Sequence, residues 1–249
     1  MAQLPRIPDL LTTANLACGV VSILLASQGQ LTLACGLVFA GAAFDVLDGL
    51  AARALGGGSE FGKQLDSLAD MVTFGVAPSF LVLCLGPIAG LSDLGVLHIG
   101  PLLMTIASAW RLAKFNVDER QASSFLGLPT PANALLWASM MLAVVSHGPN
   151  GILGIEGNLS LRAGIVLLLN KPLTILFASL ACSFLMLSSI PLPSLKFKHM
   201  KWKGNEVIYC LLATGLCLLV LYGILAVPLI LLLYLLSPLW GKLFPKQPA

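Results

Sequence analysis

Charged residues are scarce in this sequence. Only 10% of its 249 residues are charged, whereas soluble globular domains usually carry about 25%. This shortage excludes an ordinary soluble enzyme, a disordered chain and a nucleic-acid-binding protein. Hydrophobic residues take the place of the missing charges. They make up 57% of the chain and recur in long runs along nearly its whole length, which indicates a multi-pass membrane protein.

Cysteine pairs of the CxxC type are also missing. The six cysteines all lie within apolar stretches, at Cys18, Cys35, Cys84, Cys182, Cys210 and Cys217. Neither a disulfide framework nor a zinc site is indicated by this spacing. We therefore expect the cysteines to be small buried hydrophobic residues.

The apolar runs predict an all-α membrane helix bundle with about eight transmembrane helices. A span needs about 20 apolar residues, and the longest run, 207–239, is divided by Gly223 and Pro228. The expected spans are residues 11–29, 31–54, 62–86, 97–115, 129–147, 171–190, 206–222 and 226–242. A short interfacial helix is expected within 148–170, and the whole chain, 1–249, is expected to form one membrane domain.

The basic residues indicate how the bundle is oriented. Eight spans place both termini on one side, and 12 of the 14 lysines and arginines then fall on that side, leaving Arg162 and Lys171 on the other. Because cationic loops stay in the cytoplasm, we expect both termini to be cytoplasmic and the protein to lie in the cytoplasmic (inner) membrane. The segment 194–206 mixes cations with aromatic residues. It suits either an anionic lipid surface or an ordinary cytoplasmic loop.

Four carboxylates lie where a membrane protein rarely has them. Of only eleven acidic residues, Asp45, Asp48, Asp66 and Asp70 fall within or at the ends of apolar spans. An ionised carboxylate there is costly unless it is paired, hydrated or bound to a metal ion. Spacings of three and four residues place each pair on one face of a helix. The glycines at 56–58 break the chain between the two helices, so the acidic faces can meet in an antiparallel hairpin.

Such a cluster offers only oxygen ligands. Oxygen ligands favour Mg²⁺ or Mn²⁺ over zinc, and two divalent ions are a known arrangement for phosphoryl transfer. Arg53 lies on the same face as the acids of the first helix and could grip a phosphate. The acidic faces also carry small residues, at Gly49, Ala52 and Gly62. Small residues leave room either for a bulky ligand or for close helix packing.

Two classes of protein use intramembrane carboxylates in this way. One is an enzyme acting on a phosphate-bearing lipid, and the other is a divalent-cation transporter or channel. Beyond Asp70 the third span continues without a further acid. The absence of a polar path to the far side favours the enzyme.

The acidic motif matches a known family signature at every fixed position. The matching residues are Asp45, Asp48, Gly49, Ala52, Arg53, Gly62, Asp66 and Asp70, and they resemble the signature of the CDP-alcohol phosphotransferase family. The similarity covers roughly residues 4–135. Flanking segments such as RLAKFNV (111–117) and FLGLPTP (125–131) are similar to family members whose acceptor is serine.

The resemblance implies an activity and an architecture. It implies a six-helix core to which two spans are added, and usually a homodimer within the membrane lipids. It implies transfer of the phosphatidyl group from CDP-diacylglycerol to the hydroxyl of L-serine, with release of CMP. The motif alone leaves glycerol 3-phosphate or an inositol phosphate open as the acceptor.

The resemblance also assigns roles to individual residues. Asp45, Asp48 and Asp66 would bind two metal ions, Mg²⁺ or Mn²⁺, while Asp70 would bind one of them and act as the general base. Contacts with CDP-diacylglycerol would come from Gly49, Arg53, Ser59, Thr12 and Asn15. Ser59 is also placed to cap the helix that follows it.

The acceptor needs a cation if it carries a carboxylate. Arg111 and Lys114 lie one helical turn apart, with Asn116 nearby. We expect these three residues to bind serine. The alternative is that Arg111 and Lys114 only mark the cytoplasmic end of their span.

Overall fold

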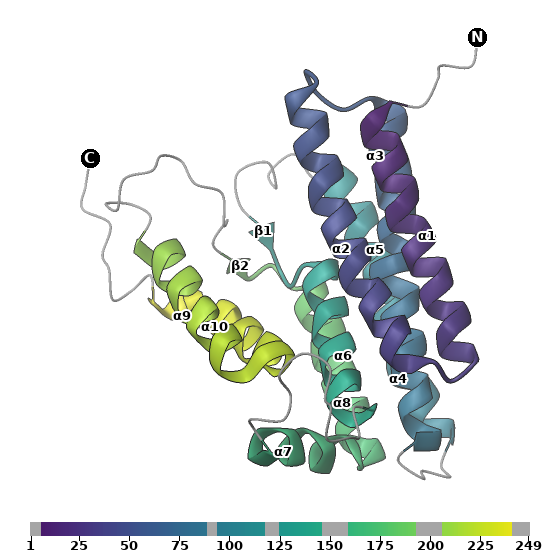
Figure 1. Cartoon of the computed structure of the whole chain (residues 1–249), viewed down its shortest axis with the longest axis vertical. Helices are drawn as coiled ribbons and strands as arrows, with labels where there is room; N and C mark the ends of the chain where they lie inside the picture. The colour runs from purple at the N-terminus through teal and green to yellow at the C-terminus, as the bar shows by residue number, and fades with distance from the viewer. Residues whose placement is uncertain (1–5, 89–93, 118–124, 146–158, 193–205, 241–249) are drawn as a thin grey trace.

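The computed structural model describes residues 6–88, 94–117, 125–145, 159–192 and 206–240, and nearly all of them are helical (Figure 1). The helices are α1 (Ile7–Ser27), α2 (Leu31–Ala54), α3 (Glu60–Asp70), η1 (Met71–Val76), α4 (Ala77–Ile88), α5 (Leu94–Val117), α6 (Thr130–Val145), α7 (Leu159–Leu169), α8 (Pro172–Leu187), α9 (Glu206–Tyr222), η4 (Gly223–Leu225) and α10 (Ala226–Trp240). Two short strands, β1 (Phe125–Leu126) and β2 (Pro191–Leu192), pair antiparallel. The expected all-α membrane fold is confirmed.

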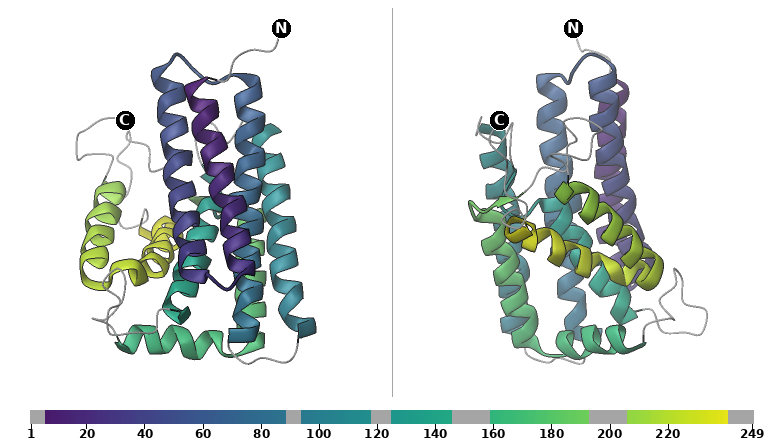
Figure 2. Two further views of the ribbon diagram at one scale, coloured as in Figure 1. Left: turned by 45° about the vertical axis from the view of Figure 1, so that its right-hand side comes forward. Right: turned by 90° about the vertical axis from the view of Figure 1, so that its left-hand side faces the viewer.

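The N-terminal helices form an up-and-down bundle. Figure 2 shows α1, α2, the α3–η1–α4 rod and α5 running side by side, each antiparallel to the helix before it. The second expected span, 31–54, agrees with the bounds of α2. The third expected span is one rod of three segments, because the π-helical turn η1 links α3 to α4.

Four helical stretches are long and apolar enough to cross a membrane. They are Ile7–Ser27, Leu31–Ala54, Glu60–Gly86 and Ile208–Leu236, and α7 with α8 makes a fifth if this pair, bent by 96°, counts as one span. The protein is therefore a multi-pass membrane protein, and the number of eight spans stays a prediction. Helix α7 lies across one end of the bundle (Figure 1) and accounts for the short helix expected within 148–170. Residues 148–158 lie outside the described part of the chain.

The chain turns back on itself within the last apolar stretch. Gly223 has a φ of +55°, and a Cβ placed on Gly215 of α9 would lie 3.8 Å from Ile230 of α10. The expected break at Gly223 is thus confirmed. Pro228 lies within the first turn of α10, where a proline is tolerated because its nitrogen needs no helical partner.

The cysteines are free throughout the described residues. Cys35 and Cys182 are buried, as expected, but Cys217 is exposed. The expectation of burial was wrong for Cys217 because, among the described residues, α9 packs mainly against α10 and Cys217 lies outside that contact.

The described cations gather at the ends of the bundle. Arg6 precedes α1, Arg53 lies in the last turn of α2, and Lys63 lies near the start of α3. Arg162 and Lys171 lie at the opposite end, on α7 and before α8. This is the expected separation for the described residues; most of the segment 194–206 lies outside them.

Candidate active site

The acidic faces of α2 and α3 meet. One carboxylate oxygen each from Asp45, Asp48 and Asp66 can be chosen so that all three lie within 4.8 Å of one another. The link between the two helices is short because Gly56 and Gly57 adopt φ values of +90° and +110°, which glycine reaches without strain. The antiparallel hairpin expected from the spacing of the acids is therefore present.

Ser59 begins the second helix of this hairpin. Its hydroxyl oxygen accepts a hydrogen bond of 2.9 Å from the backbone N–H of Gly62. This is the N-cap expected from the sequence, and it satisfies one of the free N–H groups at the start of α3.

Asp70 ends α3 one turn beyond Asp66. Its carboxylate interacts electrostatically with Asp45 and Asp66. The side-chain amide of Asn15 donates a hydrogen bond of 3.2 Å to Asp70 Oδ1, and the backbone oxygen of Asn15 accepts one of 2.9 Å from the Thr73 hydroxyl. Asn15 on α1 is therefore hydrogen-bonded both to Asp70 and to η1.

Two glycines let this region pack closely. A Cβ on Gly41 would lie 2.6 Å from Thr73 Cγ2 and 3.0 Å from Asn15 Oδ1, and one on Gly19 would meet the Thr73 hydroxyl and backbone. The glycines therefore bring α1, α2 and η1 together around Asn15 and Thr73. This role of Gly19 and Gly41 was not predicted from the sequence, although small residues within apolar spans are the usual signal of close packing. The π-helical turn begins directly after Asp70, and such turns are frequent at functional sites.

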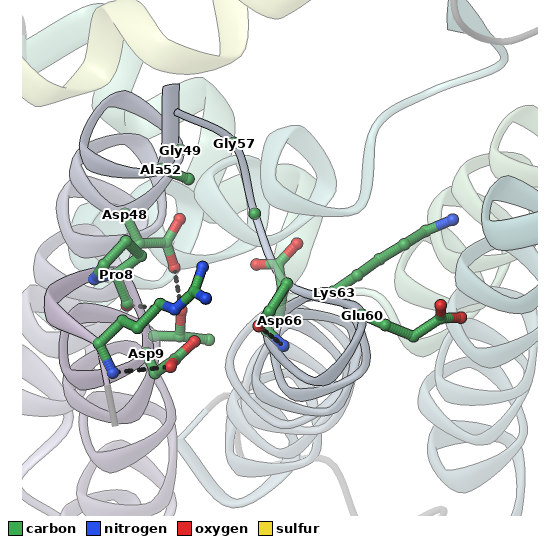
Figure 3. A pocket seen from close by; sticks show the side chains of 14 residues that line it. Pro8, Asp9, Asp48, Gly49, Ala52, Gly57, Glu60, Lys63 and Asp66 are labelled. Atoms are coloured by element: carbon green, nitrogen blue, oxygen red, sulfur yellow. Dashed lines mark hydrogen bonds between the residues drawn. The ribbon is translucent and has the colours of Figure 1, made fainter. Parts of the chain in front are cut away.

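A cavity of about 550 Å³ opens where α1 begins and α2 ends. That volume is typical of sites for small ligands, roughly 300–1,000 Å³. In Figure 3 the carboxylates of Asp48 and Asp66 lie on opposite walls, while Glu60 and Lys63 extend away from them. The cavity is lined by Arg6, Pro8, Asp9, Thr12, Asp48, Gly49, Ala52, Gly57, Gly58, Ser59, Glu60, Gly62, Lys63 and Asp66.

Polar groups in the cavity wall bond to one another. The Thr12 hydroxyl donates a hydrogen bond of 2.6 Å to Asp48, and the backbone N–H of Arg6 donates one of 2.9 Å to Asp9 (Figure 3). Arg6 and Asp9 were not expected in the site. Their position in the first turn of a span that also carries Thr12 is the signal that could have found them.

The residues expected to contact CDP-diacylglycerol divide into two groups. Thr12, Gly49 and Ser59 line the cavity. Arg53 is exposed beside it, and its guanidinium lies 3.7 Å from the position of a Cβ on Gly49. Asn15 lies deeper and contacts Asp70 rather than the cavity wall.

The three residues expected to bind serine are separated by the structure. Arg111 is buried, with 7% of its surface exposed, and interacts electrostatically with Asp70. Lys114 is exposed on α5. Asn116 donates a hydrogen bond of 2.8 Å to the Ser67 hydroxyl and accepts one of 3.1 Å from Lys63 at its backbone oxygen. Of the three, Arg111 is the one brought to the acids.

The acidic cluster suits a divalent cation. It offers three carboxylates at close range, and Asp66 Oδ1 is buried without a hydrogen-bond partner among the described residues. Hard oxygen donors with unsatisfied lone pairs are the ligands that Mg²⁺ and similar ions prefer. Deeper in the bundle the described core is apolar, with Phe74 and Leu81 packed in one cluster with Val38, so it offers no acidic path towards the far end.

Comparison with known proteins identifies the family. Residues 6–176 match the model of the CDP-alcohol phosphatidyltransferase family. The chain belongs to this family. Its members depend on divalent metal ions, in agreement with the cluster of aspartates.

Several relatives have names that describe a reaction with serine. The chain is 37% identical over 147 residues to the CDP-diacylglycerol–serine O-phosphatidyltransferase of Bacillus subtilis (strain 168), covering 59% of this chain and 78% of that protein. It is 36% identical over 213 residues to the enzyme of the same name from Helicobacter pylori (strain J99), covering 84% and 80%. It is 39% identical over 140 residues to the archaetidylserine synthase of Methanothermobacter thermautotrophicus, covering 55% and 58%.

Proposed function

We propose that this chain transfers the phosphatidyl group of CDP-diacylglycerol to the hydroxyl of L-serine, yielding phosphatidylserine and CMP. The observation that carries this proposal is the cluster of Asp45, Asp48 and Asp66 at the wall of an open cavity, in a membrane protein of this family. Relatives named for the serine reaction support the choice of acceptor.

The carboxylates are proposed as the metal ligands. Asp45, Asp48 and Asp66, together with Asp70, would hold two divalent ions, Mg²⁺ or Mn²⁺. When bound, these ions would supply positive charge that stabilises the pyrophosphate oxygens and the departing CMP.

The cavity is proposed to hold the CDP group. Gly49 and Ser59 leave room for the nucleotide in the wall, and Thr12 orients Asp48 through its hydrogen bond. Arg53, at the edge of the cavity, is placed to pair with a phosphate. The acyl chains would remain in the lipid beside the bundle.

Asp70 is proposed as the general base. Its carboxylate takes the proton of the serine hydroxyl while the serine oxygen attacks the phosphorus that bears diacylglycerol, and the bond from that phosphorus to CMP breaks. A hydroxyl is a poor nucleophile until a positioned base removes its proton. Asn15 would keep Asp70 in position through the bond to Oδ1.

The acceptor's carboxylate is proposed to pair with Arg111. This guanidinium is buried and within electrostatic range of Asp70, so a carboxylate bound there would keep its hydroxyl near the base. Lys114 and Asn116 remain predictions for the approach to this site.

The orientation and assembly are also proposals. We propose that the protein lies in the inner membrane with its cavity and both termini on the cytoplasmic side. Arg6 and Lys63 lie at the cavity, whereas Arg162 and Lys171 lie at the other end of the bundle, and cationic residues are enriched on the cytoplasmic side. A homodimer is expected by analogy with the family.

The proposal is tested with the purified protein and CDP-diacylglycerol. CMP release and lipid products would be measured with serine, glycerol 3-phosphate and inositol 1-phosphate in turn. We expect serine alone to give rapid turnover and phosphatidylserine as product. Rapid release with glycerol 3-phosphate and none with serine would assign a different acceptor.

Proteoliposomes separate the enzyme from a cation transporter. We expect no metal-ion flux under conditions in which CMP is released, because the described core beneath the aspartates is apolar. Saturable uptake of Mn²⁺ that is lost in Asp45→Ala would contradict the enzyme assignment.

A further inference from the structure

A group of buried polar atoms on α5 and α6 has no hydrogen-bond partner among the described residues. It includes Nε and Nη2 of Arg111, Oγ1 of Thr130 and both side-chain amide atoms of Asn133, and the indole Nε1 of Trp137 lies one turn further along α6. Arg111 is 7% exposed, and Thr130 and Asn133 are 0% exposed. Buried polar groups are nearly always hydrogen-bonded, because an unpaired group loses its contacts with water and gains nothing in return. These atoms therefore call for a partner that the described residues do not supply.

Helix packing brings the segments that precede Arg111 and Thr130 against the same residue of α8. Ser108, one turn before Arg111 on α5, donates a hydrogen bond of 3.6 Å to the sulfur of Met186. Met186 in turn packs in one apolar cluster with Leu128, two residues before Thr130. The loop that leads into α6 and the last turns of α5 thus meet against α8.

Arg111 and helix α6 both lie near the proposed base or the turn that follows it. Helix α6 packs against η1, which starts directly after Asp70, and Ala134 shares a core cluster with Val38 and Phe74. Arg111 interacts electrostatically with Asp70 and with Tyr234 of α10. Arg111 is thus in electrostatic range of Asp70, and the helix that carries Thr130 and Asn133 packs against the turn that begins after Asp70.

This group is distinct from the CDP cavity. The described residues that line the cavity come from α1, α2, α3 and their connections, and α5 and α6 contribute none of them. Asp70 thus lies one helical turn from Asp66 in the wall of the open cavity, and it interacts electrostatically with Arg111 of the closed group.

The unpaired atoms match the chemistry of an amino acid. Arg111 offers N–H donors of fixed geometry to a carboxylate, and Asn133 and Thr130 offer oxygen acceptors to an ammonium group. We propose that Arg111, Thr130 and Asn133 form the acceptor pocket, in which Arg111 binds the carboxylate of a zwitterionic hydroxy-amino acid and Thr130 and Asn133 bind its ammonium group. This proposal rests on the proposed function, because its ligand is the second substrate of that reaction.

The pocket gives a physical reason for selectivity. Glycerol 3-phosphate and inositol phosphate carry no ammonium group, so they would leave the oxygens of Thr130 and Asn133 unpaired in a desolvated site. A site built to bond a polar group rejects ligands that lack it far more strongly than an apolar site rejects an extra atom.

The test uses variants that keep side-chain shape and remove polarity. Thr130→Val and Asn133→Leu would each be assayed for the KM of serine and the KM of CDP-diacylglycerol. We expect the serine KM to rise about tenfold or more, the usual effect of losing a hydrogen bond to a charged group, and the KM of CDP-diacylglycerol to stay within about twofold. Thr130→Ser keeps the hydroxyl and should retain the serine KM.

Ser139→Ala is the matched control. Ser139 lies on the same helix and is equally buried, but its hydroxyl bonds to the backbone oxygen of Leu136. We expect no change in either KM. An unchanged serine KM in Thr130→Val and Asn133→Leu would overturn the pocket while leaving the serine reaction of the wild type intact. A wild type that does not use serine would instead overturn the proposed function.

Two serine analogues assign the two ends of the pocket. 3-Hydroxypropanoate lacks the ammonium group, and ethanolamine lacks the carboxylate. We expect the Thr130→Val/Asn133→Leu double variant to lose the preference for serine over 3-hydroxypropanoate, and Arg111→Met to lose the preference for serine over ethanolamine. Each preference is a ratio within one variant, so the fraction of folded protein does not affect it. Unchanged preferences in both variants would contradict the proposal and assign these side chains to packing or to bound water.

Discussion

The two sides of Asp70 satisfy their polar groups in opposite ways. On the side of the CDP cavity, the wall is open and its side chains bond within the chain, as Thr12 does to Asp48 and Ser59 does to Gly62, while Oδ1 of Asp66 faces the proposed metal site without a partner among the described residues. On the side of α5 and α6, Arg111 and Asn133 are buried with polar atoms that the described residues do not satisfy. On the proposed function, the large nucleotide would enter the preformed cavity, whereas the small acceptor would complete the hydrogen bonding of a closed pocket.

Removal of the metal ions should have the largest effect, because the proposed metal site serves the reaction of both CDP-diacylglycerol and the acceptor. Treatment with EDTA is expected to abolish CMP release with every acceptor, since the carboxylates of Asp45, Asp48 and Asp66 would be left uncompensated. Added Mg²⁺ or Mn²⁺ should restore it, as measured by CMP release under identical conditions. Full activity in metal-free buffer would rule out the metal site.

Asp70→Asn should come next, because it removes the proposed base, which lies between the two sides. We expect kcat for CMP release to fall about 10²-fold or more, with little change in the KM of either substrate. Asp66→Asn serves as the comparison, because Asp66 lies in the metal cluster and Asp70 contacts Asn15. Normal turnover in Asp70→Asn together with an inactive Asp66→Asn would reverse the two roles.

Gly41→Ala should disturb the packing that positions Asp70. The added Cβ would lie 2.6 Å from Thr73 Cγ2 and 3.0 Å from Asn15 Oδ1, and overpacking of this kind costs about 1–3 kcal/mol. A lower thermal midpoint in detergent and lower turnover are expected. Gly36→Ala on the same helix is the control, because a Cβ there has no neighbour within 4 Å among the described residues. Equal midpoints for the two variants would contradict the packing role.

Lys114→Ala should have the smallest effect on the serine KM. Its comparison with Arg111→Met tests whether the exposed and the buried cation of α5 play different roles. Exposed ion pairs are worth about 0–1 kcal/mol, so the serine KM should change less than about fivefold. Arg111→Met should raise it about tenfold to a hundredfold, because the buried guanidinium pairs with a charge out of water. A larger change at Lys114 than at Arg111 would place the carboxylate outside the pocket.

The acidic motif could be predicted from the sequence because its geometry is local. Spacings of three and four residues fix Asp45 with Asp48 and Asp66 with Asp70 on single helix faces, whatever the rest of the chain does. The glycines at 56–58 and the capping Ser59 likewise act over a few residues. Long apolar runs were enough to predict the all-α membrane fold for the same reason.

The proposed acceptor side could be predicted only in part, through Arg111, because the rest depends on contacts between distant segments. Arg111 and Lys114 share a helix face in the sequence pattern, and only the packing of α5 shows that one is buried and the other exposed. Asn133 lies in an apolar span and carries no motif, so its burial without a partner emerges only from the fold. Cys217 shows the same limit, since hydropathy does not tell a lipid-facing residue from a core residue.

One pair of variants tests the division of the site into two sides most directly. Thr12→Val and Thr130→Val make the same chemical change on opposite sides of Asp70, and the KM of both substrates would be measured for each variant. We predict that Thr12→Val raises the KM of CDP-diacylglycerol severalfold and leaves that of serine unchanged, while Thr130→Val raises the KM of serine about tenfold and leaves that of CDP-diacylglycerol unchanged. If both variants raised the KM of the same substrate, the division between an open nucleotide cavity and a closed acceptor pocket would be wrong.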